Sequence, residues 1–595
     1  MIAPMTKYSF ILLKGDQEGL LEKLQEIGLV DITRSVKPID DKSAAILADA
    51  ERKHALLQSL DKVEIPEGLA PTAVSGDPEE TAKAALDHLA ELEEALKAAE
   101  KEAAASEPWG EYDRDKLRAV EDAGIPVHFH ITPAKAFKAE WADQYALSVV
   151  NELDGKVYYV VAGEDPLPDA LKRGPKASAT DIQARIATLQ ANIDREKAVL
   201  AGVKDVRGKI ENAARRNLSD LDLYLASQAA VPAAENTLVT LVGYAPAEDE
   251  EAVTKALDAT GEYYFKDAAV VEDNPPISLK NNWFVRQFEI LTDMYGRPDY
   301  NEFDPTPYIS VFFLLFFAMC MGDAGYGLLL IIGGLLLKKV DSLKDMAPLV
   351  TILGVGTLIV GIVMHTFFGV DISALPWIPG WLKAVMITGT IAGFEAQMVI
   401  ALIIGIIHLC LAMIVKTVYA TRNKGFLGSL GTWGWTLLIV GGVIVGAMAI
   451  FSLIPPAITK WIIIVLGVLS ALGIFLFNDI NRNPIKNIGS GLWETYNTVT
   501  GLLGDVLSYL RLYALGLAGG MLGKAFNDIA AMTLGDGGLT LGWIPFILIL
   551  LIGHSLNLAM CCLGAFVHPL RLNFLEFFKN SGYDGKGRAY RPIKK

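Results

Sequence analysis

The chain has 595 residues, a net charge of −15 and 52% hydrophobic residues. This acidic balance lacks the basic footprint of a protein that binds nucleic acid. The averages hide two unlike halves, because residues 1–300 are charged and rich in Ala, Glu and Lys, whereas residues 305–575 form a succession of long apolar runs. No basic stretch followed by an apolar stretch opens the chain, so we expect the first half to stay in the cytoplasm.

The four cysteines all lie in apolar segments, at Cys320, Cys410, Cys561 and Cys562. Their spacing fits neither a disulfide framework nor a zinc site. Small buried side chains are the better interpretation, and nothing else in the sequence indicates a cofactor.

The first half begins and ends with alternating strand and helix patterns. The expected elements are strands at 7–13, 29–34, 238–243 and 263–265 and helices at 16–27 and 248–259. These distant pieces predict one proximal α/β lobe made from residues 1–40 and 230–280.

Between these pieces the hydrophobic period changes to heptad-like 4-3 spacing. It runs through Ala85, Leu89, Leu92, Leu96 and Ala99, and again through Ile182, Ile186, Leu189, Ile193, Leu200 and Val203. This predicts an antiparallel coiled coil over 42–107 and 177–225, with a distal lobe at 109–176. His128 and His130 alternate on one strand of that lobe, but no Cys or carboxylate spacing accompanies them, so we expect no metal site. The whole is a rigid two-lobed arm suited to binding partners.

The second half contains seven apolar segments, at 309–337, 347–369, 394–416, 431–454, 460–478, 487–534 and 541–574. Basic loops follow the first, third and fifth, and the basic tail 579–595 follows the seventh, which places all four in the cytoplasm. Since the first half is also expected there, the first segment must cross the membrane twice. We predict two short helices, 309–321 and 325–337, that turn at Gly322-Asp323. The result is an all-α membrane domain, 301–578, of eight helices with both termini inside.

An arginine, Arg511, stands at the middle of the sixth apolar segment. Roughly two dozen helical residues on either side put it about 35 Å from each end, too far for reliable snorkelling. A guanidinium effectively never loses its proton, and one at mid-bilayer costs at least about 3 kcal/mol. We therefore expect a partner of opposite charge that moves or titrates. The alternatives are snorkelling and structural pairing with Asp505.

Two polar seams follow helical spacing in the last two segments. The first reads Asn497, Gly501, Gly504, Ser508, Arg511, Leu515 and Ala518, and the second reads His554, Asn557, Cys561, Gly564, His568 and Arg571. The second covers about 25 Å, and together the seams resemble the lining of an ion path. Snorkelling is the alternative for Arg571 and a place in the core is the alternative for both histidines. Asp323 either caps a turn or faces a water-filled vestibule, and Glu395 is interfacial.

Four motifs in order resemble one family. They are Met294-Tyr-Gly-Arg-Pro-Asp-Tyr-Asn-Glu-Phe-Asp-Pro-Thr-Pro307, Met321-Gly-Asp-Ala-Gly-Tyr-Gly327, Leu507-Ser-Tyr-Leu-Arg-Leu-Tyr-Ala-Leu515 and Gly564-Ala-Phe-Val-His-Pro-Leu-Arg-Leu-Asn-Phe-Leu-Glu-Phe-Phe578. The sequence is similar to subunit a, called subunit I in prokaryotes, of V-type and archaeal-type rotary ATPases. The resemblance covers nearly the whole chain.

The resemblance implies two long tilted C-terminal helices that face a rotating ring of c (K) subunits, each with a membrane carboxylate. Arg511 would attract each deprotonated carboxylate and separate two ion half-channels. Arg571 matches the second arginine of the family, His568 its neighbouring histidine, and Asp323 the acid near the outer half-channel. Ser508, His554, Asn557 and Asn497 would line the path. Asn497 and Cys561 stand where carboxylates can occur, so the route there is not carried over.

The resemblance also implies partners and a location. The arm would be part of the stator and would bind the peripheral stalk subunits E and G. The central-stalk connector C/d would be a further partner, and membrane lipid would surround the second half. The chain would lie in a prokaryotic cell membrane with its large N-terminal domain and its C-terminus cytoplasmic. It has no GxxxxGK[ST] loop, so ATP chemistry would occur on other subunits and the chain would not be an enzyme by itself.

Two other functions stay open at this point. A secondary transporter could use Arg511 to bind an anion, although only one broken segment is present where paired ones are expected. A non-conducting coiled-coil membrane scaffold is the second. The coupling ion, H⁺ or Na⁺, depends on residues of the ring.

Overall fold

The computed structural model describes residues 1–35, 37–66, 68–164, 179–235, 237–340, 343–376, 378–391, 393–477, 484–534 and 542–594. The chain forms two compact units. One contains 1–10, 29–31 and 242–592, and the other contains 11–28, 32–241 and 593–595. The expected end of the distal lobe and the loop at 535–540 lie outside the described residues.

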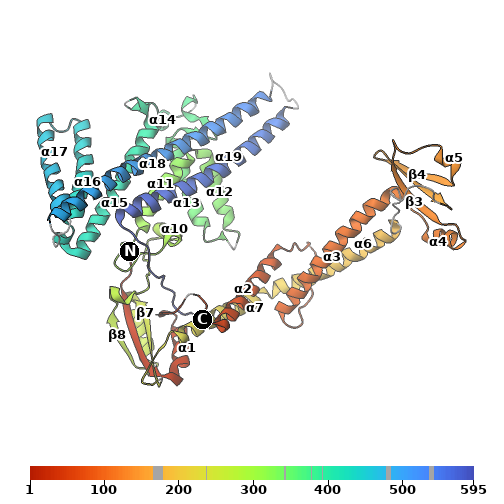
Figure 1. Cartoon of the computed structure of the whole chain (residues 1–595), viewed down its shortest axis with the longest axis horizontal. Coiled ribbons are helices and arrows are strands. Elements are labelled where there is room, and N and C mark those ends of the chain that lie inside the picture. Colours follow the sequence, from red (N-terminus) through yellow and green to blue (C-terminus); the bar gives the residue numbers. More distant parts are fainter. Residues whose placement is uncertain are drawn as a thin grey trace. The chain divides into compact units, whose positions relative to one another are not determined.

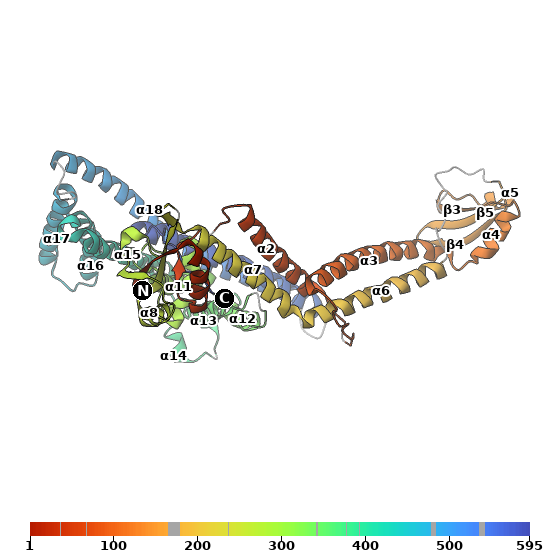
Figure 2. The same ribbon diagram turned by 90° about the horizontal axis from the view of Figure 1, so that it is seen from below.

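Long helices form most of the second of these units. α3 (Pro78–Ser106) packs along α6 (Ala179–Asp205), and α2 (Asp41–Lys62) packs along α7 (Arg207–Gln228) (Figures 1 and 2). The side chain of Asp77 caps α3 by accepting from the Glu79 amide, and Pro78 occupies the first turn. Most of the heptad positions are buried between the helices, namely Ala85, Leu89, Leu92, Ala99, Ile182, Ile193, Leu200 and Val203.

The distal lobe is a small antiparallel sheet in the order β3-β5-β4. Its strands are β3 (Val127–Pro133), β4 (Leu147–Leu153) and β5 (Lys156–Ala162). Tyr159 lies at its centre, and the ring of His130 stacks on it at 5.3 Å. His130 is therefore part of the packing of this lobe.

The proximal sheet has the order β2-β7-β1-β8, with β6 beside β7. Its strands are β1 (Met5–Leu13), β2 (Asp31–Ile32), β6 (Val231–Ala233), β7 (Leu238–Pro246) and β8 (Tyr264–Ala268). β1 and β8 pair antiparallel from Thr6↔Ala268 to Phe10↔Tyr264. α1 (Gln17–Ile27) and α8 (Glu250–Asp258) each follow a strand of this sheet, as the alternating sequence pattern predicts.

The C-terminal segment, expected only as a basic tail, pairs with the backbone of earlier residues. Ala589 forms a parallel bridge with Ile277, and Gly587 an antiparallel bridge with Arg297. A Cβ at Gly587 would lie 1.8 Å from the Pro298 carbonyl oxygen, so only glycine fits there. The backbone of the tail thus extends the fold of the first unit.

The membrane half of that unit is helical (Figure 1). Five described helices are long and apolar enough to cross a membrane, α15 (Ala396–Gly428), α16 (Leu430–Ile450), α17 (Pro456–Ala471) with the π-helix Leu472–Leu476, α18 (Pro484–Met532), and α19 (Trp543–Arg571) with the turns that follow it. Three shorter apolar helices are α11 (Thr306–Met321), α12 (Ala324–Leu337) and α13 (Ala347–Val363).

The break between α11 and α12 falls at Gly322 and Asp323, the turn that the sequence predicts. Gly322 adopts φ 58°, and Asp323 caps the next helix. Glycines then bring neighbouring helices close together. A Cβ at Gly361 would meet the Ala324 nitrogen at 2.2 Å, and one at Gly516 would meet the Met319 carbonyl oxygen at 2.6 Å. The second contact sets the end of α11 against α18, just past Arg511.

Candidate functional site

Arg511 lies on α18 without an ion pair among the described residues. The residue is half-buried, and its Nη1 atom is buried and has no hydrogen-bond partner in the described part of the chain. Asp505, the structural partner that the sequence offered, is engaged elsewhere. Its carboxylate accepts from Asn580 Nδ2 at 2.8 Å and lies 3.7 Å from Lys579 Nζ. The guanidinium is therefore available to a group that this chain does not supply in its described parts.

The Arg511 seam of α18 is partly open. Asn497, Gly504 and Ala518 are exposed, and nothing lies within 4 Å of a Cβ built on Gly504. Beside them Leu503 is 67% exposed and Leu507 is 55% exposed. A surface of small and apolar residues around one charge suits lipid or an apolar helix from another protein.

On α19 the predicted seam is tied into a hydrogen-bond network. His554 Nδ1 lies 2.8 Å from the Tyr326 hydroxyl, and its Nε2 lies 3.0 Å from Asn527 Oδ1. Asn557, which is buried, donates to the same hydroxyl at 2.8 Å and to the Gly519 carbonyl at 2.9 Å. The network joins α12, α18 and α19. Both ring nitrogens of the half-buried His554 thus have hydrogen-bond partners, and its role on the ion path stays a prediction.

Tyr326 and Asn527 were not identified from the sequence. Tyr326 lies inside a motif that the resemblance rests on, so its hydroxyl was a possible signal. Asn527 is one polar residue in a helix that contains both polar and apolar residues, and no sequence pattern distinguishes it from the others.

Asp323 has the geometry of a cap. It is 1% exposed, and its Oδ1 accepts from the amides of Gly325 (2.8 Å), Tyr326 (3.2 Å) and Phe368 (2.8 Å). Its Oδ2 accepts from the Gly369 amide at 2.7 Å. Four donors fill the acceptor capacity of a carboxylate. Asp323 thereby fastens the start of α12 to the hairpin formed by β9 (Thr366–Phe367) and β10 (Val370–Asp371).

The two residues at the end of the α19 seam differ in exposure. Arg571 is exposed, whereas His568 is half-buried and its Nδ1 has no partner among the residues that the structure describes. Pro569 interrupts the hydrogen bonding of α19, and a π-helix, η9 (Leu572–Phe577), follows. Ser508, on the Arg511 seam of α18, donates to the Gly504 carbonyl at 3.0 Å.

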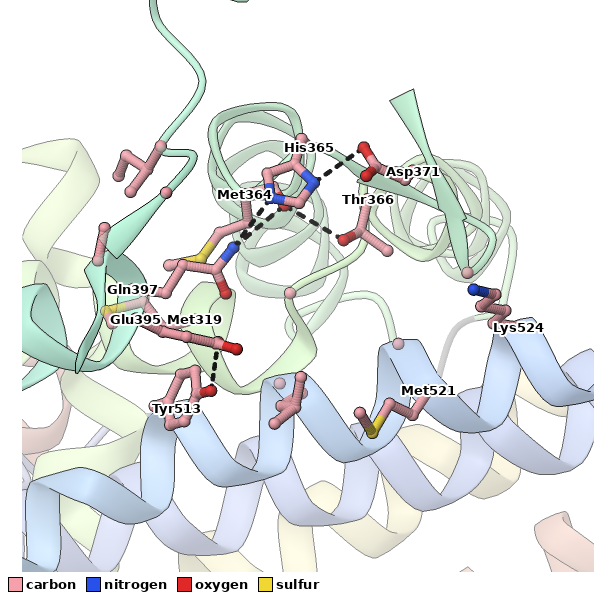
Figure 3. Close-up of a pocket in the computed structure, with 18 of the residues that line it drawn as sticks. Met319, Met364, His365, Thr366, Asp371, Glu395, Gln397, Tyr513, Met521 and Lys524 are labelled. Carbon is pink, nitrogen blue, oxygen red and sulfur yellow. Dashed lines mark hydrogen bonds and ion pairs between the residues drawn. The ribbon is translucent and has the colours of Figure 1, made fainter. Parts of the chain in front are cut away.

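A cavity of ≈ 450 Å³ lies along the part of α18 that follows Arg511. Tyr513, Gly516, Gly520 and Lys524 line it from α18, and residues of the segments 364–371, 387–390 and 395–397 line the rest. Figure 3 shows the Tyr513 hydroxyl donating to the carboxylate of Glu395, which the sequence treated only as interfacial.

His365 forms the polar wall of this cavity. Its Nδ1 lies 3.1 Å from Asp371 Oδ1, and its Nε2 lies 3.4 Å from the Gln397 amide (Figure 3). Burial opposes ionisation of Asp371, but hydrogen bonds from Ser373 and the nearby His365 hold the pKa of Asp371 below its ordinary value. The wall of the cavity is therefore polar, with the Asp371 and Glu395 carboxyl groups and the Lys524 ammonium group among its lining.

The site residues form separate groups. Asp323, His554 and Asn557 meet around Tyr326, whose amide reaches Asp323 and whose hydroxyl reaches the other two. Arg511 lies between the cavity, which begins at Tyr513, and the turn of α18 that carries Ser508. Asn497 and Arg571 are exposed near the start of α18 and the end of α19.

Residues 174–350 match a sequence model of the V-type ATPase 116kDa subunit family. The "V-type ATP synthase subunit I 1" of Treponema pallidum is 26% identical and aligns over 100% of both chains. The chain is therefore similar to this family over residues 174–350 and to a V-type ATP synthase subunit I over its whole length.

Archaeal relatives are similar to part of the chain. The "A-type ATP synthase subunit I" of Methanocaldococcus jannaschii is 32% identical over 59% of this chain and 54% of its own length. The protein of the same name from Pyrococcus abyssi is 33% identical over 59% of this chain and 53% of its own. The chain thus matches about half the length of these archaeal relatives. A solved structure described as the cytoplasmic N-terminal domain of subunit I, homolog of subunit a, of V-ATPase covers 45% of this chain at 14% identity, with a TM-score of 0.19.

Proposed function

We propose that the chain is the membrane stator subunit of a rotary ATPase or ATP synthase. It forms two ion half-channels against a ring of c (K) subunits and couples the movement of H⁺ or Na⁺ to rotation of that ring. The observation that carries the proposal is the Arg511 guanidinium, which lies deep in α18 and has no carboxylate partner among the described residues.

A fixed positive charge suits this role because the guanidinium cannot discharge in a desolvated place, whereas a lysine can. It attracts each ring carboxylate in its ionised form, favours release of the bound ion, and blocks a direct leak. The exposed small and apolar residues around Arg511 leave room for a ring helix to approach.

Polar features on both sides of Arg511 support two half-channels. The cavity with Glu395 and His365 lies along the C-terminal part of α18. Ser508 and the π-helix after Pro569 lie towards its N-terminal part. In the orientation that the basic loops indicate, the first is the outer half-channel and the second is the cytoplasmic one.

The role of Asp323 in this proposal is to shape the outer half-channel. Its four amide partners hold the 366–371 hairpin that closes the cavity. His554 and Asn557 connect α12 to α18 and α19 in the same region. His568, Arg571 and Asn497 belong to the cytoplasmic side.

The soluble half acts as the stator arm in this proposal. Its coiled helices and lobes bind the peripheral stalk subunits E and G, and the central-stalk connector C/d is a further neighbour. ATP is hydrolysed or made on other subunits. Eight crossings, with α11, α12 and α13 as the short spans, put the arm and the C-terminus in the cytoplasm.

The decisive experiment uses Arg511→Ala and Arg511→Lys in vesicles that carry the assembled complex. We expect ATP-driven ion uptake to disappear in the first and to fall strongly in the second, while the complex keeps its full set of subunits. Arg422→Ala, an exposed arginine near the end of α15, is the matched control and should pump normally. Uptake retained by Arg511→Ala would reject the stator channel, and loss of uptake with normal assembly would reject a passive scaffold.

A labelling experiment tests the topology separately. A cysteine placed at Val340, between α12 and α13, should react only with reagent on the cytoplasmic side. Reaction from the outside would overturn the eight crossings.

A further inference from the structure

Tyr509 and Arg511 lie on opposite faces of α18. Successive residues of an α-helix are about 100° apart around its axis, so these two side chains are separated by about 200°. Tyr509 is fully buried, as is Leu512 one turn later, whereas Arg511 is half-buried on the partly open face. The contacts that hold the Tyr509 face therefore set the direction in which the guanidinium of Arg511 points.

Two residues of α15, Gly405 and His408, form a notch that receives the Tyr509 side chain. They are three positions apart and hence on the same face of α15, and both are buried. A Cβ built on Gly405 would lie 2.3 Å from Cγ of the Tyr509 ring, so any larger side chain there would displace the ring. The Tyr509 hydroxyl lies 2.9 Å from His408 Nδ1. The notch thus holds the ring by shape and the hydroxyl by a hydrogen bond.

Aromatic rings surround the His408–Tyr509 hydrogen bond. The His408 ring stacks on Phe577 at 4.7 Å with 6° between the two planes, and it lies 4.2 Å from the ring of Phe312. Phe316 meets both partners edge-on, at 5.1 Å from His408 and 5.7 Å from Tyr509. The other ring nitrogen of His408 is buried and has no partner among the described residues. In such apolar surroundings a polar pair that separates finds no ready replacement, so the hydrogen bond opposes rotation of α18.

Rotation of α18 matters because Arg511 is pulled from outside the chain. In the proposed function each ring carboxylate attracts the guanidinium as it arrives and as it leaves, and this force acts sideways on the helix. Apolar contacts have no preferred direction, whereas a hydrogen bond weakens steeply when it is bent. The hydrogen bond on the Tyr509 face is therefore the contact that best resists turning.

A small rotation has a large effect on a group at the end of a side chain. A turn of about 20° moves a group that lies about 6 Å from the helix axis by about 2 Å. A misplacement of about 1 Å can cost ~100-fold in a process that depends on precise geometry. The direction of the guanidinium therefore needs an anchor on the opposite face of α18.

We propose that His408 is a positioning residue for Arg511. Through the Tyr509 hydroxyl it anchors the back of α18 to α15 and keeps the guanidinium directed at the passing ring carboxylates. His408 stays in its aromatic surroundings and carries no ion, so it acts on ion movement only through Tyr509 and the helix. This role rests on the proposed stator function and adds the element that holds Arg511 against the pull of the ring.

Single and double variants of the assembled complex test this role, with ATP hydrolysis and the uptake of H⁺ and of Na⁺ measured in vesicles. Tyr509→Phe removes only the hydroxyl and leaves a ring in the notch, and His408→Phe keeps a flat ring but removes the hydrogen bond. In each, we expect the number of ions taken up per ATP hydrolysed to fall at least ~10-fold. Tyr496→Phe, at a 63% exposed tyrosine of the same helix, is the matched control and should keep the wild-type ratio.

The double variant, His408→Phe with Tyr509→Phe, separates positioning from stability. Each single variant leaves one buried polar partner unpaired and should lower the thermal midpoint of the complex, whereas replacing both partners by apolar rings of similar shape can be nearly neutral. We expect the midpoint to return towards wild type in the double variant while the uptake per ATP stays low. Recovery of both together would make the hydrogen bond merely structural and would overturn the positioning role.

The outcomes also separate this role from the stator function. If Arg511→Ala stops uptake while Tyr509→Phe pumps as wild type, the positioning role fails and the stator function stands. If Arg511→Ala still pumps, both fail. Should the single variants not assemble, the double variant decides, because wild-type uptake there would overturn the positioning role and low uptake with normal assembly would support it.

Discussion

Replacing Asp323 with alanine should detach the 366–371 hairpin from the start of α12. The carboxylate is the acceptor for four amides, and two of these, from Phe368 and Gly369, belong to the hairpin. The alanine variant leaves both hairpin amides without their acceptor. The hairpin would still be held to α18 by the Asn527 side-chain amide, which donates to the Phe368 carbonyl at 2.7 Å.

The size of the effect follows from these contacts. A hydrogen bond to a charged group contributes about 1.5–3 kcal/mol. Losing the two that reach the hairpin therefore weakens its attachment by about 3 kcal/mol at the lower end, roughly a hundredfold in the opening equilibrium. Amide exchange reports such local opening. In the assembled complex, a peptide covering 364–371 should exchange roughly a hundredfold faster in the variant.

Asp528→Ala removes an exposed carboxylate from α18 and should leave that exchange unchanged. The cap would be refuted if the exchange of the hairpin were the same in Asp323→Ala and wild type. A variant with normal exchange and no ion uptake would instead make Asp323 an ion-carrying group.

Three further predictions concern other contacts. Tyr326→Phe removes the hydroxyl at the centre of the α12–α19 network and takes one hydrogen-bond partner from His554 Nδ1 and one from Asn557 Nδ2, so the thermal midpoint of the complex should fall in line with a loss of about 1–3 kcal/mol. Gly405→Ala places a Cβ 2.3 Å from the ring of Tyr509, and the overpacking should cost about 1–3 kcal/mol in the same measurement. Asp273→Asn removes the negative charge that lies 2.5 Å from Lys7 Nζ, and the hydrogen bond from Lys7 is what holds the pKa of Asp273 below its ordinary value. This ion pair stabilises the fold by at most about 1 kcal/mol. The stabilisation is present above the ordinary pKa of about 4 and is lost as pH falls through the lower pKa of the folded state. Amide exchange of β8 should therefore distinguish the variant from wild type at neutral pH and not in acid.

Matched substitutions control these results. Gly442→Ala adds a Cβ in open space and should not lower the thermal midpoint. Glu272→Gln changes an exposed neighbour of Asp273 and should leave β8 exchange unaltered at both pH values. An Asp273→Asn difference that persisted in acid would contradict the ion pair as its source.

The local parts of the fold could be predicted because their signals are local. Three glycines and an aspartate predict the break at Gly322-Asp323, and the structure ends α11 at Met321 and begins α12 at Ala324. The 4-3 spacing finds most of the residues that α3 and α6 bury. Helical spacing likewise placed His554 and Asn557 on one face of α19.

The missed features depend on contacts between distant segments. Two of the four amides that hold Asp323 come from Phe368 and Gly369, about 45 residues later, and backbone donors leave no side-chain signature. The basic composition of the tail indicated a side of the membrane but gave no sign of its pairing with Ile277.

That pairing has a practical consequence for handling the protein. The Tyr590 hydroxyl donates to the Leu29 carbonyl at 2.5 Å, the Arg591 amide donates to Asp31 at 3.0 Å, and Ile593 is fully buried. A purification tag or fluorescent fusion joined directly after these residues would pull on the lobe they help to build. The exposed turn at Asp154-Gly155, between β4 and β5, is a gentler place to attach one.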